Sequence, residues 1–427
     1  MRKTPHCKYI PYSHITLPYE LDKLLRTLYT KGVKPIIVGG YVRDALLGIS
    51  NRKDIDIEIY GIDSYESLQK LLKPFGKVNL VGKSFGVCKL RIGSLECDFS
   101  LPRRENKVAS GHKGFEIIID PQLSFFEASK RRDFTINALG YDPIKKELID
   151  CHGGIQDLQN KTLKAVDENT FKEDPLRVLR AVVFAARFGF QLDPSLFHTC
   201  KTMIAEGMLQ ELPKERIFEE LKKLFQRANR PSIAFELLDG MQERYYFAEF
   251  FQLPKGLQKH TLASIDRLAS KNIHELSLYF ALLIQKVRDK NSFLLRFTTN
   301  KKLIKEICTL LECLEKSCIL LQKESSAFEV KLLATTCNIE KSLLLLRALY
   351  PKMEPFFSRL ENLAKKLDVF QQPPSPLITG KELIHAGLSP SKEFKEILHE
   401  LYMQQLAGNP ISKEKLKEYL QSQGYLN

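Results

Sequence analysis

The stretch that most constrains the fold of this chain is residues 36 to 56. An apolar run breaks at Gly39 and Gly40, a segment with apolar residues at helical spacing follows, and a second apolar run carries Asp54 and Asp56. This order predicts a strand, a glycine turn, a helix and a second strand. Because successive side chains of a strand point to opposite faces, Asp54 and Asp56 share one face and form a paired-carboxylate platform.

Such a platform suits magnesium. Mg²⁺ takes oxygen ligands and is usually bound through one or two carboxylates together with substrate phosphates. The glycines serve the same end, because residues without a Cβ let a triphosphate come close to the backbone at Gly39 and Gly40. Amide groups at the start of the following helix point toward negative charge, and Arg43 adds a positive fork one turn into that helix.

Each of these features has a simpler explanation when it stands alone. An Asp-x-Asp pair is usually a solvated strand end, and a Gly-Gly pair ahead of a helix is usually only a turn. These simpler explanations do not predict the joint spacing of the glycines, the arginine and the two aspartates. The spacing therefore favours a magnesium site that accepts a triphosphate.

Length and composition narrow the class of protein. The chain has 427 residues, which is too long for one ordinary core and suggests roughly two to four units. With 44% hydrophobic and 27% charged residues it is neither disordered nor membrane-embedded. No run approaches the roughly twenty apolar residues of a spanning helix, and the basic N-terminus lacks the apolar core of a signal peptide, so we expect a cytoplasmic protein.

Charge and cysteine content bear on partners and cofactors. The chain carries 65 Lys plus Arg against 51 Asp plus Glu, a formal net charge of +14. An excess of this size favours a polyanionic partner such as nucleic acid, although basic proteins without one also exist. The nine cysteines include no Cys-x-x-Cys pair, so we expect reduced, mostly structural thiols and no zinc site.

A third carboxylate follows the central motif. Residues 77 to 101 alternate and are rich in Val, Leu, Ile and Phe, which predicts β-hairpins that complete the sheet, with Asp98 on the last strand. A carboxylate there has a chemical use, because metals need ligands and the attacking hydroxyl must lose its proton near one of them. The alternative is an ordinary surface residue of a strand. Residues 104 to 115 predict a mobile loop, either a gate that closes on nucleotide or an ordinary hairpin loop.

A cluster of cations precedes the next apolar segment. Residues 130 to 132 read Lys-Arg-Arg, and Asp133 is placed to cap a following helix. An arginine of this cluster is suited to clamp a triphosphate or a ribose. The alternative is a surface ion pair between arginine and aspartate, which contributes little stability.

From residue 171 onward the chain is dominated by Leu, Lys and Glu at helical spacing, with no convincing strand pattern. The first of these helices opens near residue 173 with acids and a proline, as a helix start should. Asp174, Arg177 and Arg180 are spaced by three, so they share one face of this helix.

Asp174 and Arg177 have the chemistry to select a base. Cytosine and adenine each present an amine donor beside a ring-nitrogen acceptor, whereas uracil and guanine reverse this pattern. A carboxylate that accepts from the amine and a guanidinium that donates to the ring nitrogen would take C and A and reject U and G, because the wrong base leaves buried polar groups unpaired. The alternative is an intrahelical ion pair worth about 0.2 to 0.5 kcal/mol, which for an isolated Asp-x-x-Arg is the better explanation.

Three separated motifs resemble the class II branch of the polymerase-β nucleotidyltransferase superfamily, which holds tRNA CCA-adding enzymes and bacterial poly(A) polymerases. They are Gly-Gly-x-Val-Arg-Asp-x-Leu-Leu-Gly with Asp-x-Asp, Arg-Arg-Asp-Phe-Thr-Ile-Asn-Ala, and Glu-Asp-Pro-Leu-Arg-Val-Leu-Arg-Ala. The resemblance covers nearly the whole chain and is strongest over residues 36 to 190. It implies an α+β fold, with a small polymerase-β-type nucleotidyltransferase sheet domain followed by an all-helical neck, body and tail.

The resemblance also implies a division of the chain into four parts. Many bacterial relatives carry a His-Asp phosphohydrolase unit in the body, but this chain has Gln285 and Lys286 where that doublet is expected, so we expect a degenerate body without a hydrolase site. The expected parts are a catalytic head at 1–169, a helical neck with the nucleotide-selecting motif at 170–230, a helical body at 231–372 and an RNA-binding helical tail at 373–427.

Roles for individual residues follow from the same resemblance. It implies that Asp54 and Asp56 hold Mg²⁺ and that Asp174 and Arg177 form an amino-acid template for C and A. Many relatives carry a further arginine at the position of Val183, so one phosphate contact is either missing here or supplied elsewhere. The resemblance also implies four nucleotide contacts, namely Gly40, Arg43, Arg132 and Arg180. From the residue pattern, we expect Gly39 to be a further nucleotide contact and Asp98 to be a third catalytic carboxylate beside Asp54 and Asp56.

The expected activity is template-independent addition of the 3′-terminal CCA to tRNA, with CTP and ATP as substrates, Mg²⁺ as cofactor and no membrane or obligate protein partner. Two other interpretations stay open. One is a narrower enzyme of the same family that adds only CC, only A or a poly(A) tail. The other is a catalytically idle RNA-binding protein that kept the fold, against which the intact Asp54, Asp56, Asp174 and Arg177 argue.

Overall fold

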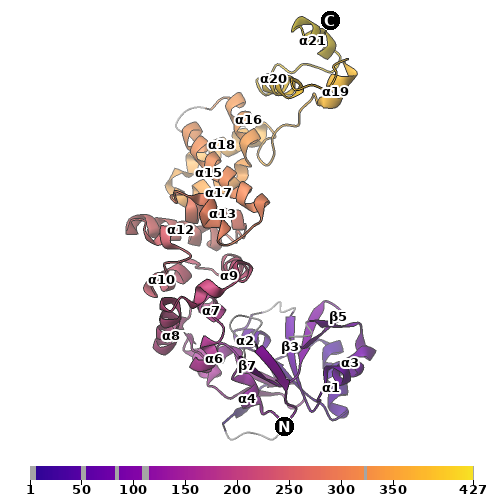
Figure 1. Cartoon of the computed structure of the whole chain (residues 1–427), viewed down its shortest axis with the longest axis vertical. Coiled ribbons are helices and arrows are strands. Elements are labelled where there is room, and N and C mark those ends of the chain that lie inside the picture. The colour runs from indigo at the N-terminus through magenta and orange to yellow at the C-terminus, as the bar shows by residue number, and fades with distance from the viewer. Residues whose placement is uncertain (1–5, 50–53, 82–85, 108–114, 322–324, 427) are drawn as a thin grey trace. The chain divides into compact units, whose positions relative to one another are not determined.

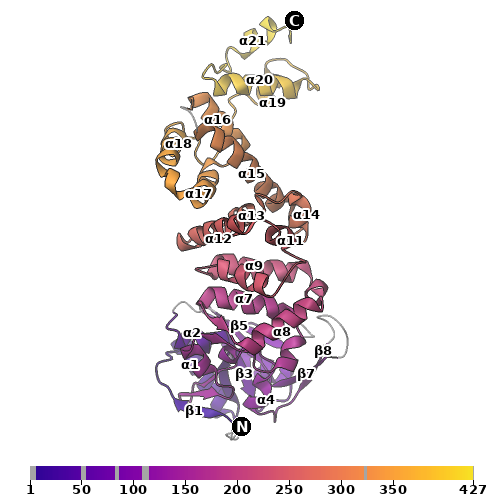
Figure 2. The same ribbon diagram turned by 90° about the vertical axis from the view of Figure 1, so that its left-hand side faces the viewer.

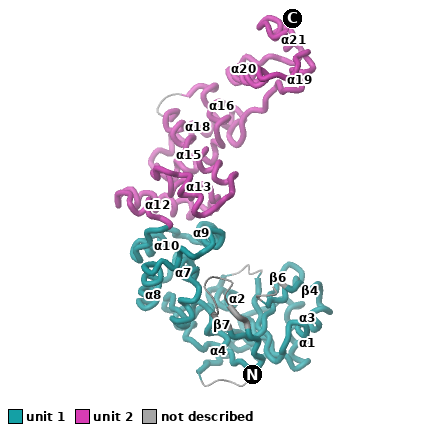
Figure 3. The backbone as a smooth tube through the Cα atoms, viewed as in Figure 1, with its two compact units in different colours: residues 1–245 teal, residues 246–427 magenta. Residues whose placement is uncertain are grey.

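The computed structural model consists of two compact units, Met1–Tyr245 (unit 1) and Tyr246–Asn427 (unit 2) (Figure 3). Within the residues that the structure describes, no helix is both long enough and apolar enough to cross a membrane. The expected division into head, neck, body and tail is finer than these two units and stays a prediction. The described residues are 6–49, 54–81, 86–107, 115–321 and 325–426.

Unit 1 is built around a mixed sheet of eight strands (Figure 1). In chain order they are β1 (Lys8–Pro11), β2 (Lys34–Val38), β3 (Asp54–Tyr60), β4 (Val78–Val81), β5 (Val87–Ile92), β6 (Leu95–Ser100), β9 (Gly140–Asp142) and β10 (Glu147–Asp150). They lie side by side in the order β1-β10-β9-β2-β3-β6-β5-β4. β3 and β6 run parallel, and the other neighbouring pairs are antiparallel.

Helices make up most of the rest of unit 1. Two short strand pairs accompany them, β7 (Arg103–Lys107) with β8 (Phe115–Ile119) and β11 (Thr162–Leu163) with β12 (Gln191–Leu192). A sheet domain that precedes a long helical series confirms the predicted α+β class. The helices are α1 (Tyr19–Thr30), α2 (Gly40–Leu46), α3 (Tyr65–Leu72), α4 (Phe125–Ser129), α5 (Gly154–Gln159), α6 (Glu168–Lys172), α7 (Leu176–Phe188), α8 (Pro194–Ala205), α9 (Lys214–Arg227) and α10 (Ser232–Gly240), with 3-10 turns η1 (Lys73–Phe75), η2 (Thr135–Asn137) and η3 (Met208–Glu211).

The sequence of β3 explains how the sheet presents polar groups. Its residues alternate between acidic side chains and isoleucine up to residue 59, so the two kinds point to opposite faces. The isoleucines are buried on one face, and on the other Phe125 of α4 packs against Ile36 and Val38 of β2. The acidic side chains of β3 therefore lie on the same face as α4.

Local patterns predicted the elements around the central motif correctly. The strand, glycine turn, helix and strand appear as β2, α2 and β3. The next helix, α3, begins after Ser64, whose side chain accepts a hydrogen bond from the amide of Ser67 at 3.3 Å. The predicted loop at 104–115 is too long, because residues 104–107 and 115 belong to β7 and β8. The part proposed as a gate or hairpin loop, 108–114, lies outside the described residues.

The prediction of reduced thiols is wrong for four of the cysteines. Cys7 is joined to Cys151, and Cys313 to Cys337, with Cα–Cα distances of 4.0 Å and 6.1 Å. The first pair is 144 residues apart in sequence, and it meets because β1 pairs with β10 in the sheet. Sequence spacing alone carries no information about such a pairing.

Unit 2 is helical throughout its described residues. Helices α15 to α18 enclose one buried apolar cluster, and α19 to α21 enclose a second. The helices are α11 (Ala248–Phe251), α12 (Lys255–Ser270), α13 (Leu276–Ile284), α14 (Lys290–Leu295), α15 (Lys301–Leu321), α16 (Ala327–Thr336), α17 (Ile339–Leu349), α18 (Glu354–Lys366), α19 (Gly380–His385), α20 (Phe394–Leu406) and α21 (Leu416–Ser422), with a 3-10 turn η4 (Pro351–Met353).

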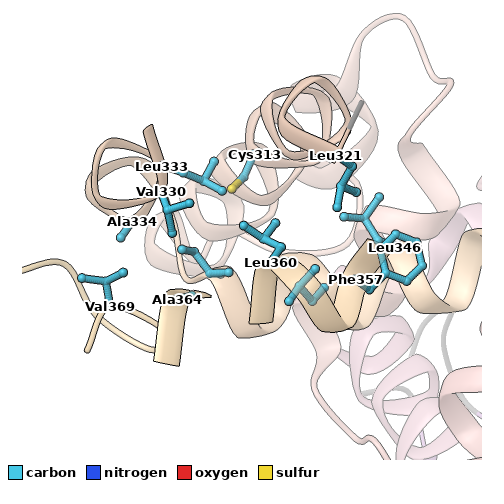
Figure 4. Close-up of a cluster of buried hydrophobic side chains, with 12 residues drawn as sticks. Cys313, Leu321, Val330, Leu333, Ala334, Leu346, Phe357, Leu360, Ala364 and Val369 are labelled. Carbon is cyan, nitrogen blue, oxygen red and sulfur yellow. The ribbon is translucent and has the colours of Figure 1, made fainter. Parts of the chain in front are cut away.

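The first cluster shows how helical spacing builds this core. Phe357, Leu360 and Ala364 follow one stripe of α18 at intervals of three and four residues, and each is buried. They meet side chains from three other helices, among them Leu346 of α17 and Val330 of α16 (Figure 4). The stripe therefore joins four segments that are separate in sequence.

We expect Phe357→Ala to lower the free energy of unfolding of unit 2 by about 3 to 5 kcal/mol, because it leaves a cavity where a fully buried ring was. The measurement is urea unfolding of the full chain, followed by circular dichroism. Phe356→Ala is the matched control, since the neighbouring ring is 45% exposed and its loss should change stability by no more than about 0.5 kcal/mol. Equal losses in the two variants would contradict this account of the core.

Candidate active site

The predicted catalytic carboxylates lie on adjacent strands. β3 and β6 are parallel neighbours, and their register places Asp56 directly beside Asp98. Asp54 shares the face of Asp56, because the two residues are separated by one position on the same strand. The three carboxylates that the sequence singled out therefore gather on one face of the sheet.

The glycine turn approaches this face closely. Gly39 has φ +74°, a left-handed conformation that side chains rarely adopt. A Cβ on Gly39 would lie 2.9 Å from Nη1 of Arg132 and 3.2 Å from Oδ2 of Asp56. Glycine at this position thus brings the backbone, the predicted metal-binding carboxylate and the predicted phosphate-binding arginine together.

The carboxylates repel one another electrostatically. Although the Asp56 side chain is open to solvent, the surrounding protein removes part of the hydration of its carboxyl, and this raises its pKa. The positive charge of Arg132 opposes this rise in pKa, whereas Asp98 and Asp54 add to it. Lys89 of β5 partly balances the charge, with Nζ 3.0 Å from Oδ2 of Asp98.

This donor set suits a hard divalent cation. The side chains offer only carboxylate oxygens, the ligands that such cations prefer, and a bound cation would relieve their mutual repulsion. Among the described residues, no group of three or more His, Cys, Asp or Glu side chains is already drawn together as a metal site. Asp54 and Asp56 are the residues that would hold the cation, since Asp98 is engaged by Lys89.

Arg43 lies inside the protein rather than on its surface. Its side chain is almost completely buried, its Nε donates to Asp44 at 2.7 Å and its Nη1 donates to Asn137 at 2.6 Å. Its guanidinium carbon lies 5.1 Å and 4.9 Å from the ring centres of Phe184 and Phe188 of α7, as in cation–π contacts. The arginine therefore ties the helix that follows the glycine turn to α7.

Asp133 is the partner of Arg180. Its Oδ2 accepts from Nε of Arg180 at 2.8 Å, and its Oδ1 accepts from the side chain of Asn137 at 2.9 Å. Asp133 was predicted to cap a helix, but the segment that follows is only the 3-10 turn η2. Burial alone would raise the pKa of Asp133, but Arg180 and the hydrogen bond from Asn137 outweigh burial and hold this pKa below its usual value.

Arg177 is held by backbone oxygens next to the sheet. Its Nη1 donates to the carbonyl of Thr170 at 2.6 Å, and its Nη2 donates to the carbonyl of Arg131 at 2.7 Å. The side chain of Arg131 in turn donates to the buried Glu58 of β3 at 2.9 Å. The start of α7 is thereby linked to the strand that carries Asp54 and Asp56.

Asp174 binds Arg216, a residue that no motif in the sequence singles out. Arg216 of α9 donates from Nη1 to Oδ1 at 3.3 Å and from Nη2 to Oδ2 at 3.0 Å. The simple intrahelical pair of Asp174 with Arg177 is therefore not the arrangement here, because the structure gives the two side chains different partners. Arg216 lies 42 residues further along the chain, and an amphipathic helix pattern alone does not reveal which distant side chain it meets.

The comparisons with known proteins bear on this geometry. Residues 36–164 match the family model described as poly A polymerase head domain, and residues 189–242 match the model described as probable RNA and SrmB-binding site of polymerase A. The first match spans the glycine turn, the three carboxylates and Arg132. Over these two stretches the chain is similar to the poly(A) polymerase family, and the stretches together span less than half of the chain.

Curated relatives of this family match part of the chain. A multifunctional CCA protein of Nitrosospira multiformis is 34% identical over 262 residues, which cover 59% of this chain and 60% of the relative. A CCA-adding enzyme of Coxiella burnetii is 40% identical over 192 residues, which cover 45% of this chain and 48% of the relative. The matches thus span about half to three-fifths of the length of these relatives.

Solved structures of the family match more of the chain. The apo form of a tRNA-processing enzyme is 26% identical, with a TM-score of 0.66 over 92% of this chain and 100% of that chain. The Thermotoga maritima CCA-adding enzyme complexed with tRNA is 22% identical, with a TM-score of 0.64 over 95% of this chain and 96% of that chain, and this likeness shows a shared fold. Nucleotidyltransferases of this family use divalent metal ions, in agreement with the oxygen donors of β3.

One departure from the family pattern has a clear place in the structure. Val183, where many relatives carry arginine, is buried on α7. Arg187 lies one helical turn later, with Nη2 3.6 Å from Oδ2 of Asp44. Arg187 therefore belongs to the cluster around Arg43 and Asp44.

We expect Asp133→Asn to lower the free energy of unfolding at pH 7 by about 3 kcal/mol, because it leaves the guanidinium of Arg180 without its buried counterion. The lowered pKa of Asp133 also means that its ionised form stabilises the fold above the unfolded-state pKa and loses this effect as the pH falls. Unfolding free energies between about pH 5 and about pH 3 should therefore fall more for the wild type than for the variant. The measurement is urea unfolding across that pH range.

Asp22→Asn serves as the control, since Asp22 pairs with Arg26 on the exposed surface of α1. We expect its stability to stay within about 0.5 kcal/mol of the wild type at pH 7. If Asp133→Asn were equally mild, the ion pair with Arg180 would not stabilise unit 1 as described.

Proposed function

We propose that the chain is a tRNA nucleotidyltransferase that adds the 3′-terminal CCA to tRNA from CTP and ATP without a nucleic-acid template. The observation that carries the proposal is the convergence of Asp56, Asp98, Arg132 and the Gly39 turn on one face of the sheet. Such a site has the charges and the open backbone that a nucleoside triphosphate requires. The names of the relatives, which include CCA-adding enzymes, support this substrate class.

Magnesium is the cation we propose for Asp54 and Asp56. When bound, it would lower the pKa of an attacking hydroxyl and neutralise charge that develops on the transferred phosphoryl group. Mg²⁺ is bound characteristically through one or two carboxylates and substrate phosphates, which matches two aspartates on one strand face.

The residues of the chain would then position the reacting groups. The 3′ hydroxyl of tRNA attacks the α-phosphate of CTP or ATP, a new P–O bond forms, and pyrophosphate leaves. Arg132 lies beside the glycine turn, where its positive charge can hold the triphosphate. Because phosphoryl transfer depends mainly on positioning and charge stabilisation, these contacts account for most of what the protein must supply.

Base selection is the proposed role of Asp174 and Arg177. The carboxylate of Asp174 accepts from the amine of cytosine or adenine, and the guanidinium of Arg177 donates to the adjacent ring nitrogen. Uracil and guanine place an acceptor against the carboxylate and a donor against the guanidinium, so they leave polar groups unpaired. The carbonyls of Thr170 and Arg131 hold Arg177 in position for this contact.

Transfer RNA is the proposed macromolecular partner. The net charge of +14 suits an RNA backbone, and one solved structure of similar fold is a CCA-adding enzyme complexed with tRNA. Recognition would rest mainly on shape and backbone contacts, with affinity that falls steeply as salt rises. The RNA-binding tail at 373–427 and the cytoplasmic location stay predictions.

The test is a product analysis at single-nucleotide resolution. The pure protein is incubated with Mg²⁺ and a tRNA transcript that ends at the discriminator base, with CTP alone, ATP alone, or both. We expect a stop after two C with CTP alone and a complete CCA end with both. A stop at CC in the presence of both nucleotides would indicate a CC-adding enzyme. A long ladder of added A residues would indicate a poly(A) polymerase, and the absence of product in every reaction would indicate an idle RNA-binding protein.

We expect Asp56→Asn to lower kcat at least about a thousandfold, because it removes a metal-binding charge while keeping the size of the side chain. Asp63→Asn is the matched control, since Asp63 is an exposed residue of the loop before α3. The control should extend tRNA at the wild-type rate, and both variants should unfold at the wild-type temperature. Substantial CCA addition by Asp56→Asn would contradict the assignment of this carboxylate.

A further inference from the structure

Arg216 holds the carboxylate of Asp174 as a fork. The two guanidinium nitrogens Nη1 and Nη2 meet the two carboxylate oxygens at 3.3 Å and 3.0 Å. Each side chain is only 23% exposed, so the pair is shielded from much of the screening that weakens surface ion pairs. A two-point contact between planar groups fixes the plane of the carboxylate as well as its distance.

The helix that carries Arg216 is itself held firmly. α9 packs along α7, and Figure 2 shows the two helices side by side. Ile217 follows Arg216 directly in sequence and is buried on α9. Leu221, one helical turn after Ile217, is also buried. Glu220 of the same helix is buried with Oε1 4.0 Å from Nη1 of Arg180. The position of the Arg216 fork is therefore set by packing in unit 1.

The contacts of Asp174 leave little acceptor capacity. An ionised carboxylate offers about four lone-pair positions on its two oxygens. Oδ1 accepts from the amide of Leu176 at 3.1 Å and from Arg216, and Oδ2 accepts from Arg216. Within the described part of the chain, one acceptor position, on Oδ2, is left over. A single position matches the single amine group that cytosine or adenine presents on the edge read by this pair.

We propose that Arg216 is a positioning residue that sets base selectivity, by orienting Asp174 so that one acceptor position of Oδ2 faces the amine of the incoming base. This inference rests on the proposed function. The forked arginine fixes both oxygens of the carboxylate, and these oxygens accept hydrogen bonds. Uracil O4 and guanine O6 are acceptors, so a carboxylate held in this orientation gives them no partner.

Loss of the fork should relax this discrimination. Without the fork the carboxylate of Asp174 can rotate away from the base, and this removes the fixed acceptor that excludes uracil O4 and guanine O6. Arg216→Gln removes the charge and the fork, whereas Arg216→Lys keeps the charge but supplies only a point contact. We therefore expect the selectivity of Arg216→Lys to lie between those of the wild type and Arg216→Gln.

The experiment measures kcat/KM for CTP and for UTP on a tRNA transcript that ends at the discriminator base, with Mg²⁺. We expect the CTP-to-UTP ratio to fall about tenfold or more in Arg216→Gln. Arg227→Gln is the matched control, because Arg227 is exposed at the end of the same helix and should leave the ratio unchanged. Thermal unfolding of each variant separates selectivity from stability, and Arg216→Lys provides the ratio if Arg216→Gln does not fold.

Three outcomes overturn the inference. One is a ratio within about twofold of the wild type in a folded Arg216 variant, which would make Arg216 a structural residue only. A second is faster CTP addition with the ratio preserved, which would mean that Arg216 competes with the base for Asp174. A third is a wild-type protein that neither extends tRNA nor prefers CTP over UTP.

Equilibrium dialysis with labelled CTP and UTP separates the inference from the proposed function. A wild-type protein that binds CTP preferentially but adds no nucleotide would contradict CCA addition, and the same dialysis on Arg216→Gln would still test the inference. A loss of binding preference in that variant, with Arg227→Gln unaffected, is the result expected in that case.

Discussion

The buried ion pair between Asp133 and Arg180 is the contact on which the arrangement of unit 1 depends. Its two charges come from the segment after α4 and from the middle of α7, and the buried carboxylate of Asp133 is destabilised if its counterion is lost. Arg43 reaches the same region from α2 and ends between Phe184 and Phe188. Three segments are therefore held together by charges that each need a partner, rather than by apolar contacts alone.

β3 links the two ends of the proposed nucleotide site. Asp56 faces the glycine turn and Arg132, where a triphosphate would lie. Glu58, two residues later on the same face, holds Arg131, whose carbonyl accepts from Arg177. β3 therefore positions Asp56 at the phosphate end of the proposed site. Through Glu58 and the carbonyl oxygen of Arg131, it also helps to position Arg177 at the base end.

How far the site could be predicted depended on how local each interaction is. The alternation of β3 placed Asp54 and Asp56 on one face, and the register with β6 put Asp98 beside them as expected. Arg43 shows the limit of such reasoning, since its spacing after Gly40 is compatible with a phosphate contact but its guanidinium is almost completely buried. Burial of a charge depends on which distant groups meet it, and helical spacing does not contain that information.

The sequence by itself determined the strand-turn-helix-strand unit around the glycines and the identity of the acidic and basic groups, because these follow from periodicity, turn chemistry and side-chain type. It also indicated the α+β class, through the resemblance of its three motifs to a known family. Only the tertiary structure decided which charges are paired. Asp174 with Arg216 and Asp133 with Arg180 join residues 42 and 47 positions apart, and Cys7 meets Cys151 through the pairing of β1 with β10. Such contacts form because elements distant in sequence pack against one another, and local sequence preferences do not determine that packing.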